Sequence, residues 1–136
     1  LESTVTAAIP AASTKSVGFI IKNILFRNYL LGFRNRDNGH SLENVVYFEL
    51  LRRGYDVSIG KVDNAEVDFI AINSEGEEYY QVSQSVLEEQ TLKRELASLE
   101  AINDHNPKYL LTMDFTPFTS YNGIKQINVL EWLMKR

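Results

Sequence analysis

Hydrophobic side chains recur every three to four positions in two segments of the chain, which predicts two amphipathic helices. The first runs from Ser41, a suitable N-cap residue, to Arg53, and Gly54 provides its stop. The second begins near Leu87 and carries one apolar stripe, formed by Leu92, Leu96, Leu99 and Ile102. A short terminal helix that carries Trp132 is also expected.

Four shorter segments have the composition and spacing of β-strands. Residues 55–59 alternate between apolar and polar side chains, and residues 66–72, 79–84 and 109–113 are predicted as further strands. Turns are expected at residues 60–65 and around Gly76, so the first three strands would form a meander. A loop over residues 115–122 would lead to Ile124, Ile127 and Val129. The order helix, three strands, helix, strand indicates an α/β domain with a mixed sheet.

The N-terminal region differs from the rest in composition. Residues 1–14 are mostly small or polar and include Pro10, which predicts a linker or N-terminal arm before a single domain over residues 15–136. Residues 15–32 are strongly apolar and fit either a short strand or a helix that ends at Gly32. Polar residues such as Lys22 and Arg27 interrupt this region, so no membrane span and no membrane partner are expected.

Composition limits the class of protein. The chain has 136 residues, of which 44% are hydrophobic, enough for one globular domain and too many for a disordered chain. It has no cysteine, which excludes a disulfide-stapled secreted module and predicts a reducing, cytoplasmic location. Because it begins with Leu1 and no signal sequence follows, we expect a domain fragment of a longer protein.

The net charge of −4 is unevenly distributed. Residues 1–61 hold eight Lys and Arg against five Asp and Glu, whereas residues 62–136 hold six against thirteen. A basic surface that faces a polyanion is one interpretation, and an ordinary solvated surface is the other. The candidate nucleic-acid-binding residues are Arg34, Arg36, Arg52, Arg53 and Lys61.

Several polar side chains occupy positions suited to chemistry. Asp68 lies in an apolar strand, Glu66 is expected on the same face, and Glu43 lies one turn into the first helix. Together with Gln81 they could supply the oxygen ligands that Mg²⁺ or Mn²⁺ prefers. The structural alternative is that Asp68 caps a backbone amide or pairs with Lys61.

Histidines and aromatic residues are assigned structural positions. His40 and His105 lie beside turn residues without metal-ligand spacing, so both are expected in surface loops. The aromatic residues have the spacing of buried strand and helix faces, and we expect them in the core: Tyr47, Phe48, Tyr55, Phe69, Tyr79 and Tyr80.

Four segments carry a family resemblance over about residues 39–132: LENVVYFELLRRGYDVSIGK, AEVDFIAI, YYQVSQSV and KYLLTMD. In this order they resemble the C-terminal domain of unknown function found in predicted bacterial and archaeal AAA+ ATPases. The core of that domain is in turn similar to the restriction-endonuclease-like, PD-(D/E)XK, superfamily. The resemblance implies a mixed central sheet of about four to five strands flanked by helices. It also implies an N-terminal AAA+ ATPase domain as partner in the parent chain.

The resemblance assigns roles to four residues of a nuclease-like catalytic site. The helix glutamate of the superfamily falls on Glu43, its strand aspartate on Asp68, and its (D/E)-x-K position on Gln81 to Ser83. An amide oxygen at position 81 can still bind a metal, but Ser83 brings no positive charge where the superfamily has lysine. Lys93 or Arg94, on the following helix, are the cations that could replace it in space.

These assignments predict a catalytically impaired recognition module for DNA or RNA. The alternatives are an active phosphodiesterase that uses Mg²⁺ or Mn²⁺, and a protein-interaction or oligomerisation module. No G-x-x-x-x-G-K-[ST] motif occurs in the chain, so ATP would bind only in the N-terminal part of the parent protein.

Overall fold

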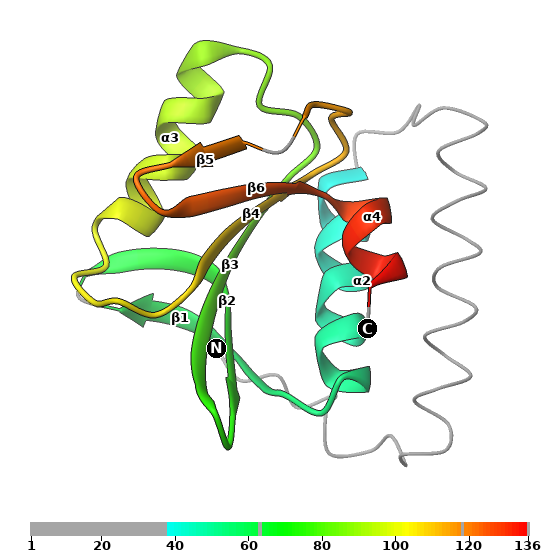
Figure 1. Ribbon diagram of the computed structural model, residues 1–136, viewed down its shortest axis with the longest axis vertical. Coiled ribbons are helices and arrows are strands. Elements are labelled where there is room, and N and C mark those ends of the chain that lie inside the picture. The colour runs from blue at the N-terminus through cyan, green and yellow to red at the C-terminus, as the bar shows by residue number, and fades with distance from the viewer. Residues whose placement is uncertain (1–37, 63, 118, 136) are drawn as a thin grey trace.

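The computed structural model describes residues 38–62, 64–117 and 119–135 (Figure 1). Three helices are described: α2 (Asn38–Arg52), α3 (Glu89–Glu100) and α4 (Val129–Met134). The strands are β1 (Asp56–Val62), β2 (Ala65–Asn73), β3 (Gly76–Ser83), β4 (Lys108–Thr112), β5 (Thr119–Tyr121) and β6 (Ile124–Asn128). The predictions made for residues 1–37, including Arg34 and Arg36, lie outside the described residues.

The strands form one six-stranded mixed sheet in the order β1-β2-β3-β4-β6-β5. β1, β2 and β3 pair antiparallel, which confirms the predicted meander. β4 then lies parallel to both β3 and β6, and β5 closes the far edge antiparallel to β6. The predicted α/β class and mixed sheet are confirmed, with six strands. Two strands were not among the four predicted. β5 lies in the segment expected to be a loop, because three residues are too few to show a period, and β6 lies in the segment after it, to which no element was assigned.

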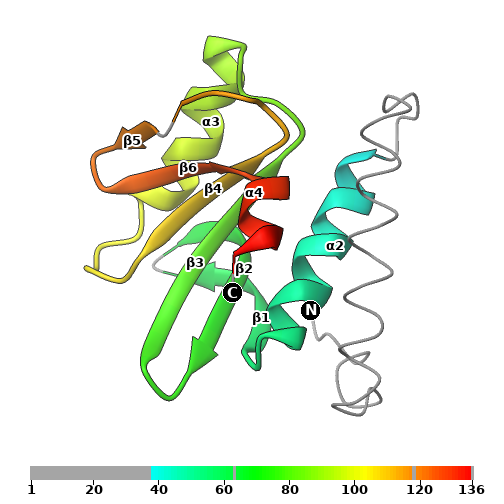
Figure 2. The ribbon, with the colours of Figure 1, turned by 45° about the vertical axis from the view of Figure 1, so that its right-hand side comes forward.

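Helices cover both faces of the sheet (Figures 1 and 2). α2 and α4 pack on one face over a cluster that includes Val46, Leu50 and Leu111. α3 packs on the other face through its predicted stripe, with Leu96 and Leu99 buried against the sheet. The aromatic residues lie in or against these two clusters, as predicted. Among the described residues, no helix is long and apolar enough to cross a membrane.

Several element boundaries differ from the prediction. α2 begins at Asn38, so Ser41 is an internal helix residue and not the N-cap, and His40 lies in the helix instead of a loop. His105 is exposed between α3 and β4, as expected. The expected turn at 60–65 is much shorter, because the strands extend to Val62 and from Ala65. Polar residues around helix starts and hairpins carry little periodic signal, so such boundaries are hard to place from sequence.

One irregularity in the β1–β2 pair positions the candidate site. Ser58 pairs with Ile70 and Gly60 pairs with Val67, so one residue of β1 lies opposite both Asp68 and Phe69. Such a β-bulge redirects the side chains that follow it. Val67 accordingly packs in the cluster below α3, whereas Phe69 packs in the cluster below α2. Asp68 therefore lies at the point in β2 where the odd-numbered side chains change from the α3 side of the sheet to the α2 side.

Candidate functional site

Asp68 and Gln81 bridge β2 and β3 just beyond the end of their backbone pairing. The last paired residues are Phe69 and Tyr80. Beyond them, the carboxylate Oδ2 of Asp68 accepts a hydrogen bond from the backbone N–H of Val82 at 2.8 Å. In the other direction, the backbone N–H of Asp68 donates to Oε1 of Gln81 at 3.1 Å. The alternative in which Asp68 caps a backbone amide is thus confirmed.

The side chain of Gln81 continues this network to the opposite helix. Its Nε2 donates to Oε2 of Glu95, on α3, at 2.8 Å. The other carboxylate oxygen of Glu95 accepts from the guanidinium of Arg94 at 3.1 Å. Glu95 is only 9% exposed, so these two donors stabilise a charge that is largely removed from water. We call Asp68, Gln81 and Glu95 with these hydrogen bonds the amide bridge.

The charge on Asp68 is destabilised by its surroundings. Burial raises the pKa of the Asp68 carboxyl to about 6, and the negative charges of Glu43 and Glu95 act in the same direction. The hydrogen bond from the Val82 N–H opposes these effects because it stabilises the ionised form. Carboxylates from α2 and α3 are therefore close enough to Asp68, on β2, to disfavour its charge.

The structure gathers only some of the residues predicted for the site. Asp68 and Gln81 are in direct contact, and Glu43 lies near enough to act on the Asp68 pKa. Glu66 is not part of this group, since its side chain is 80% exposed and lies 3.8 Å from the ammonium of Lys61. Lys61 therefore pairs with Glu66, and not with Asp68 as the structural alternative allowed. The hydroxyl of Ser83 donates to the carbonyl of Ser85, a contact within the loop that follows β3.

The residues present do not fit a Mg²⁺ or Mn²⁺ ion. Such an ion needs several free oxygen ligands directed at one point. Gln81 instead turns its oxygen to the Asp68 N–H and its NH₂ group to Glu95, so both ends of the amide are already bonded. Among the residues that the structure describes, no three His, Cys, Asp or Glu side chains form a group able to hold a metal ion.

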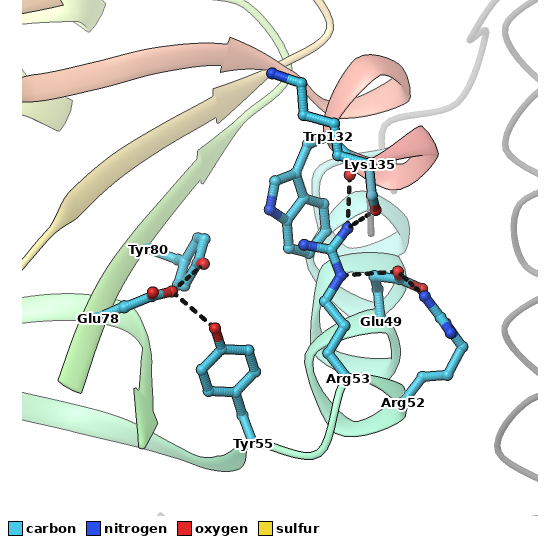
Figure 3. Close-up of polar contacts among 8 residues, drawn as sticks. All are labelled: Glu49, Arg52, Arg53, Tyr55, Glu78, Tyr80, Trp132 and Lys135. Atoms are coloured by element: carbon cyan, nitrogen blue, oxygen red, sulfur yellow. Dashed lines mark hydrogen bonds and ion pairs between the residues drawn. The ribbon is translucent and has the colours of Figure 1, made fainter. Parts of the chain in front are cut away.

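Two of the arginines predicted to bind nucleic acid make internal contacts (Figure 3). Arg52 donates from two nitrogens to the two carboxylate oxygens of Glu49, at 2.8 and 2.6 Å. Arg53 donates to Glu49 as well, and also to the backbone carbonyls of Trp132 and Lys135. Its guanidinium lies 4.3 Å from the centre of the Trp132 ring. Both arginines thereby bind Glu49 of α2, and Arg53 also holds the C-terminal end of α4.

The two cations considered as substitutes for the missing lysine have different positions. Lys93 forms an exposed ion pair with Glu89 at 2.7 Å, along the helix surface. Arg94 reaches the amide bridge through its contact with Glu95, although its own side chain is 73% exposed. Arg94 is therefore the cation linked to the site, and its charge acts on Glu95.

Comparison with known proteins gives one relative. The chain is 37% identical over 122 residues to an uncharacterized protein of Haemophilus influenzae. The match covers 90% of this chain but only 30% of that relative. No family model and no solved structure matches the chain. This chain thus spans about 30% of the length of that relative.

Sequence reasoning missed Glu95, although a signal was available. Position 95 lies three residues after Leu92 and four before Leu99, so it belongs to the buried face of α3. A glutamate on a buried helix face requires partners. Its presence there could have indicated a polar contact with the sheet.

A second buried polar network also escaped prediction. Ser83, Thr112 and Asn128 are aligned across the parallel strands β3, β4 and β6. Thr112 Oγ1 accepts from the backbone N–H of Asp114 and from Gln126 Nε2, while Asn128 Nδ2 donates to the Asp114 carbonyl. These bonds fix the loop after β4 to the carboxyl edge of the sheet. These residues come together only through the register of β4 against β6, which no local sequence pattern predicts.

Proposed function

We propose that this chain is a nuclease-like accessory domain of a AAA+ ATPase that has lost catalysis and serves as a recognition module. The observation that carries the proposal is the state of Gln81. Its amide is bonded to Asp68 and Glu95 at the position where a metal-dependent nuclease needs a free ligand.

The residue two positions further supports the same proposal. A nuclease of this kind needs a cation beside the attacking water, and loss of such a group costs about 3 kcal/mol of transition-state stabilisation. Ser83 supplies only a hydroxyl, and that hydroxyl donates to the Ser85 carbonyl. Arg94 is bonded to Glu95, which reduces the charge it could offer to a phosphate.

The proposed setting is a longer, cytoplasmic protein. The Haemophilus influenzae relative is more than three times as long as the segment it shares with this chain, which is consistent with an accessory domain. In this proposal ATP is bound by the N-terminal part of the parent chain, and the domain described here has no role in its hydrolysis.

We further propose that the recognition partner of the described surface is a protein. The described residues include eight Lys and Arg against fifteen Asp and Glu, a net charge of −7. Polyanion binding relies on neutralising phosphates with free cations. Arg52 and Arg53 make internal contacts, which leaves Lys61 as the exposed member of the predicted set within the described residues.

The test is a nuclease and binding assay on the full chain. We expect no cleavage of DNA or RNA in Mg²⁺ or Mn²⁺, and no binding to a labelled duplex by fluorescence anisotropy at physiological salt. Cleavage that disappears in Asp68→Ala would establish the active phosphodiesterase instead.

Nucleic-acid recognition would give a different pattern in the same assay. Tight binding that weakens steeply with salt, and weakens further in Arg34→Ala and Lys61→Ala, would replace the protein partner by a polyanion. Lys125→Ala, a change at an exposed lysine on β6, is the matched control for a general charge effect.

A further inference from the structure

The amide bridge needs a group that donates and accepts at the same time. The backbone N–H of Asp68 requires an acceptor, and the Glu95 carboxylate requires a donor. Among uncharged side chains of this length, the amide of glutamine offers both, with an oxygen at one corner and an NH₂ group at the other. The two partners therefore also fix which way the amide is turned.

A carboxylate at position 81 would meet different conditions. It could still accept from the Asp68 N–H, but its second oxygen would lie against the carboxylate of Glu95, 2.8 Å away in the present geometry. Asp68 and Glu43 add two further negative charges to the same region. Four carboxylates in such a group are stable only with a bound proton or a bound cation.

We propose that the amide of Gln81 takes the place of a divalent cation in this site. Its NH₂ group donates to the Glu95 carboxylate and so stabilises that charge, as a metal ion would. Its oxygen accepts from the Asp68 N–H, so that Gln81 connects Glu95 to β2. The site is consequently metal-independent as it stands, and one carboxylate at position 81 is sufficient to make it bind Mn²⁺ through Asp68, Glu95 and the new side chain. The inference rests on the hydrogen bonds of Gln81 and on the neighbouring carboxylates, and it holds for any recognition partner of the domain.

The first arm of the test measures melting temperature of the full chain in a metal chelator. Gln81→Glu should melt lower than the wild type, because two carboxylates then face each other without a donor. The double variant Gln81→Glu/Glu95→Gln should recover the wild-type value, since the amide at position 95 can donate to the carboxylate at position 81. Gln90→Glu makes the same chemical change at an exposed position of α3 and should leave the melting temperature unchanged.

The second arm adds Mn²⁺. The melting temperature of Gln81→Glu should rise by about 5 °C at saturating metal. The wild type, the double variant and Gln90→Glu should not move. An equal rise in the wild type would overturn the proposal, and so would a Gln81→Glu protein as stable in chelator as the wild type.

The exchanged pair keeps the proposal open to refutation if Gln81→Glu does not fold. A double variant that folds with the wild-type melting temperature would support the bridge, because only the direction of one hydrogen bond has been reversed. A double variant no more stable than Gln81→Glu would refute it.

Discussion

The charged side chain of Asp68 makes a hydrogen bond to the neighbouring strand of the kind that a backbone carbonyl makes in a sheet. Its carboxylate accepts from the Val82 N–H and so extends the β2–β3 connection past the last backbone pair. A neutral acceptor of the same shape could make this hydrogen bond without placing a charge near Glu43 and Glu95. The raised pKa of Asp68 shows that the charge itself is a cost to the folded state.

Replacement of this charge should therefore stabilise the protein. Asp68→Asn keeps an oxygen for the Val82 N–H and removes a largely buried negative charge. We expect the free energy of unfolding at pH 7 to rise by roughly 1 to 2 kcal/mol, measured by urea denaturation. Asp56→Asn, at an exposed position of β1, is the control and should have little effect. A less stable Asp68→Asn protein would show that the charge is needed.

The stability difference between Asp68→Asn and the wild type should also depend on pH. Folding raises the pKa of Asp68 from 3.8 to about 6, so between these values the folded state binds more protons than the unfolded state. Stability from this group is therefore fully present below pH 4 and is lost as pH rises through 6. The advantage of Asp68→Asn over the wild type should shrink as pH falls from 7 to 4. Unfolding curves at several pH values measure this, and a constant difference would contradict it.

At the residue scale, the energetic cost of burying a charged side chain was the most useful signal in the sequence. A carboxylate in an apolar strand marked Asp68 as a residue that needs partners, and the structure supplies them. Gln81 was expected beside Asp68, but the Val82 N–H and Glu95, which bonds to Gln81, were not identified, because they belong to other elements than Asp68. The direction in which the Gln81 amide is turned depends on the Asp68 N–H and the Glu95 carboxylate together.

Helix α4 is too short to be stable alone and relies on contacts at both of its ends. At its start, Oδ1 of Asn128 accepts from the backbone N–H groups of Leu130 and Glu131. At its end, Arg53, which directly follows α2, donates to the carbonyls of Trp132 and Lys135 (Figure 3). A cation at a helix C-terminus also interacts favourably with the helix dipole.

Arg53 should contribute more to stability than its neighbour. Arg53→Ala removes two hydrogen bonds to α4 and the contact with the Trp132 ring, and should cost about 2 to 3 kcal/mol. Arg52→Ala, the control, leaves Glu49 paired with Arg53 and should cost about 1 kcal/mol. Urea denaturation gives both values. Trp132 is the only tryptophan in the chain, so acrylamide quenching should increase in Arg53→Ala alone. Equal losses in the two variants would contradict this account.

The start of α4 provides an independent prediction. Asn128→Ala removes the side-chain cap and should lower the free energy of unfolding by about 1 kcal/mol. Asn128→Asp keeps the capping oxygen but loses the donor to the Asp114 carbonyl, so it should be less damaging. Thermal unfolding compares the two variants. Asn128→Asp as unstable as Asn128→Ala would show that the Asp114 contact, and not the cap, is important.

At the element scale, predictability followed length. α3 was found from its period because it buries one continuous face, and the long strands of the meander were found from their alternating or apolar residues. β5 has three residues and was missed. The start of α2 was also misplaced, since the polar residues before Ser41 fit a turn as well as a first helical turn.

The sheet distributes stability unevenly across the molecule. β3 and β4 lie at its centre and contribute fully buried side chains such as Tyr79, Leu110 and Leu111. β5 lies at one edge and, among the described strands, pairs only with β6. Central strands open only when the whole domain unfolds, whereas short edge strands open locally.

Hydrogen exchange should follow this arrangement. We expect backbone amides of β4 to exchange only at the rate of global unfolding, and those of β5 to exchange much faster. Mass spectrometry of peptides that cover residues 108–112 and 119–121 measures the difference. Equal protection of both peptides would indicate that β5 is held by contacts other than its pairing with β6.

At the scale of the whole molecule, the α/β class, the meander and the contact between Asp68 and Gln81 were predicted, but the positions of Glu66 and Glu95 were not. The two helical stripes and the alternating strands required two layers of helix around one sheet. The bulge at Asp68 and Phe69 produces the change of face in β2, and a strict period of two cannot indicate it. Glu66 was expected beside Asp68 on exactly that regular spacing and lies in solvent instead.

The order of strands also bears on how the domain folds. β1, β2 and β3 are neighbours in sequence and can pair through short hairpins, whereas β4 joins β3 only after the chain has crossed over through α3. Local contacts generally form before distant ones, because less chain entropy is lost. Asp68 and Gln81 would then meet early, and Glu95 would arrive with α3. A change at Glu95 should therefore speed unfolding while leaving the folding rate nearly unaltered.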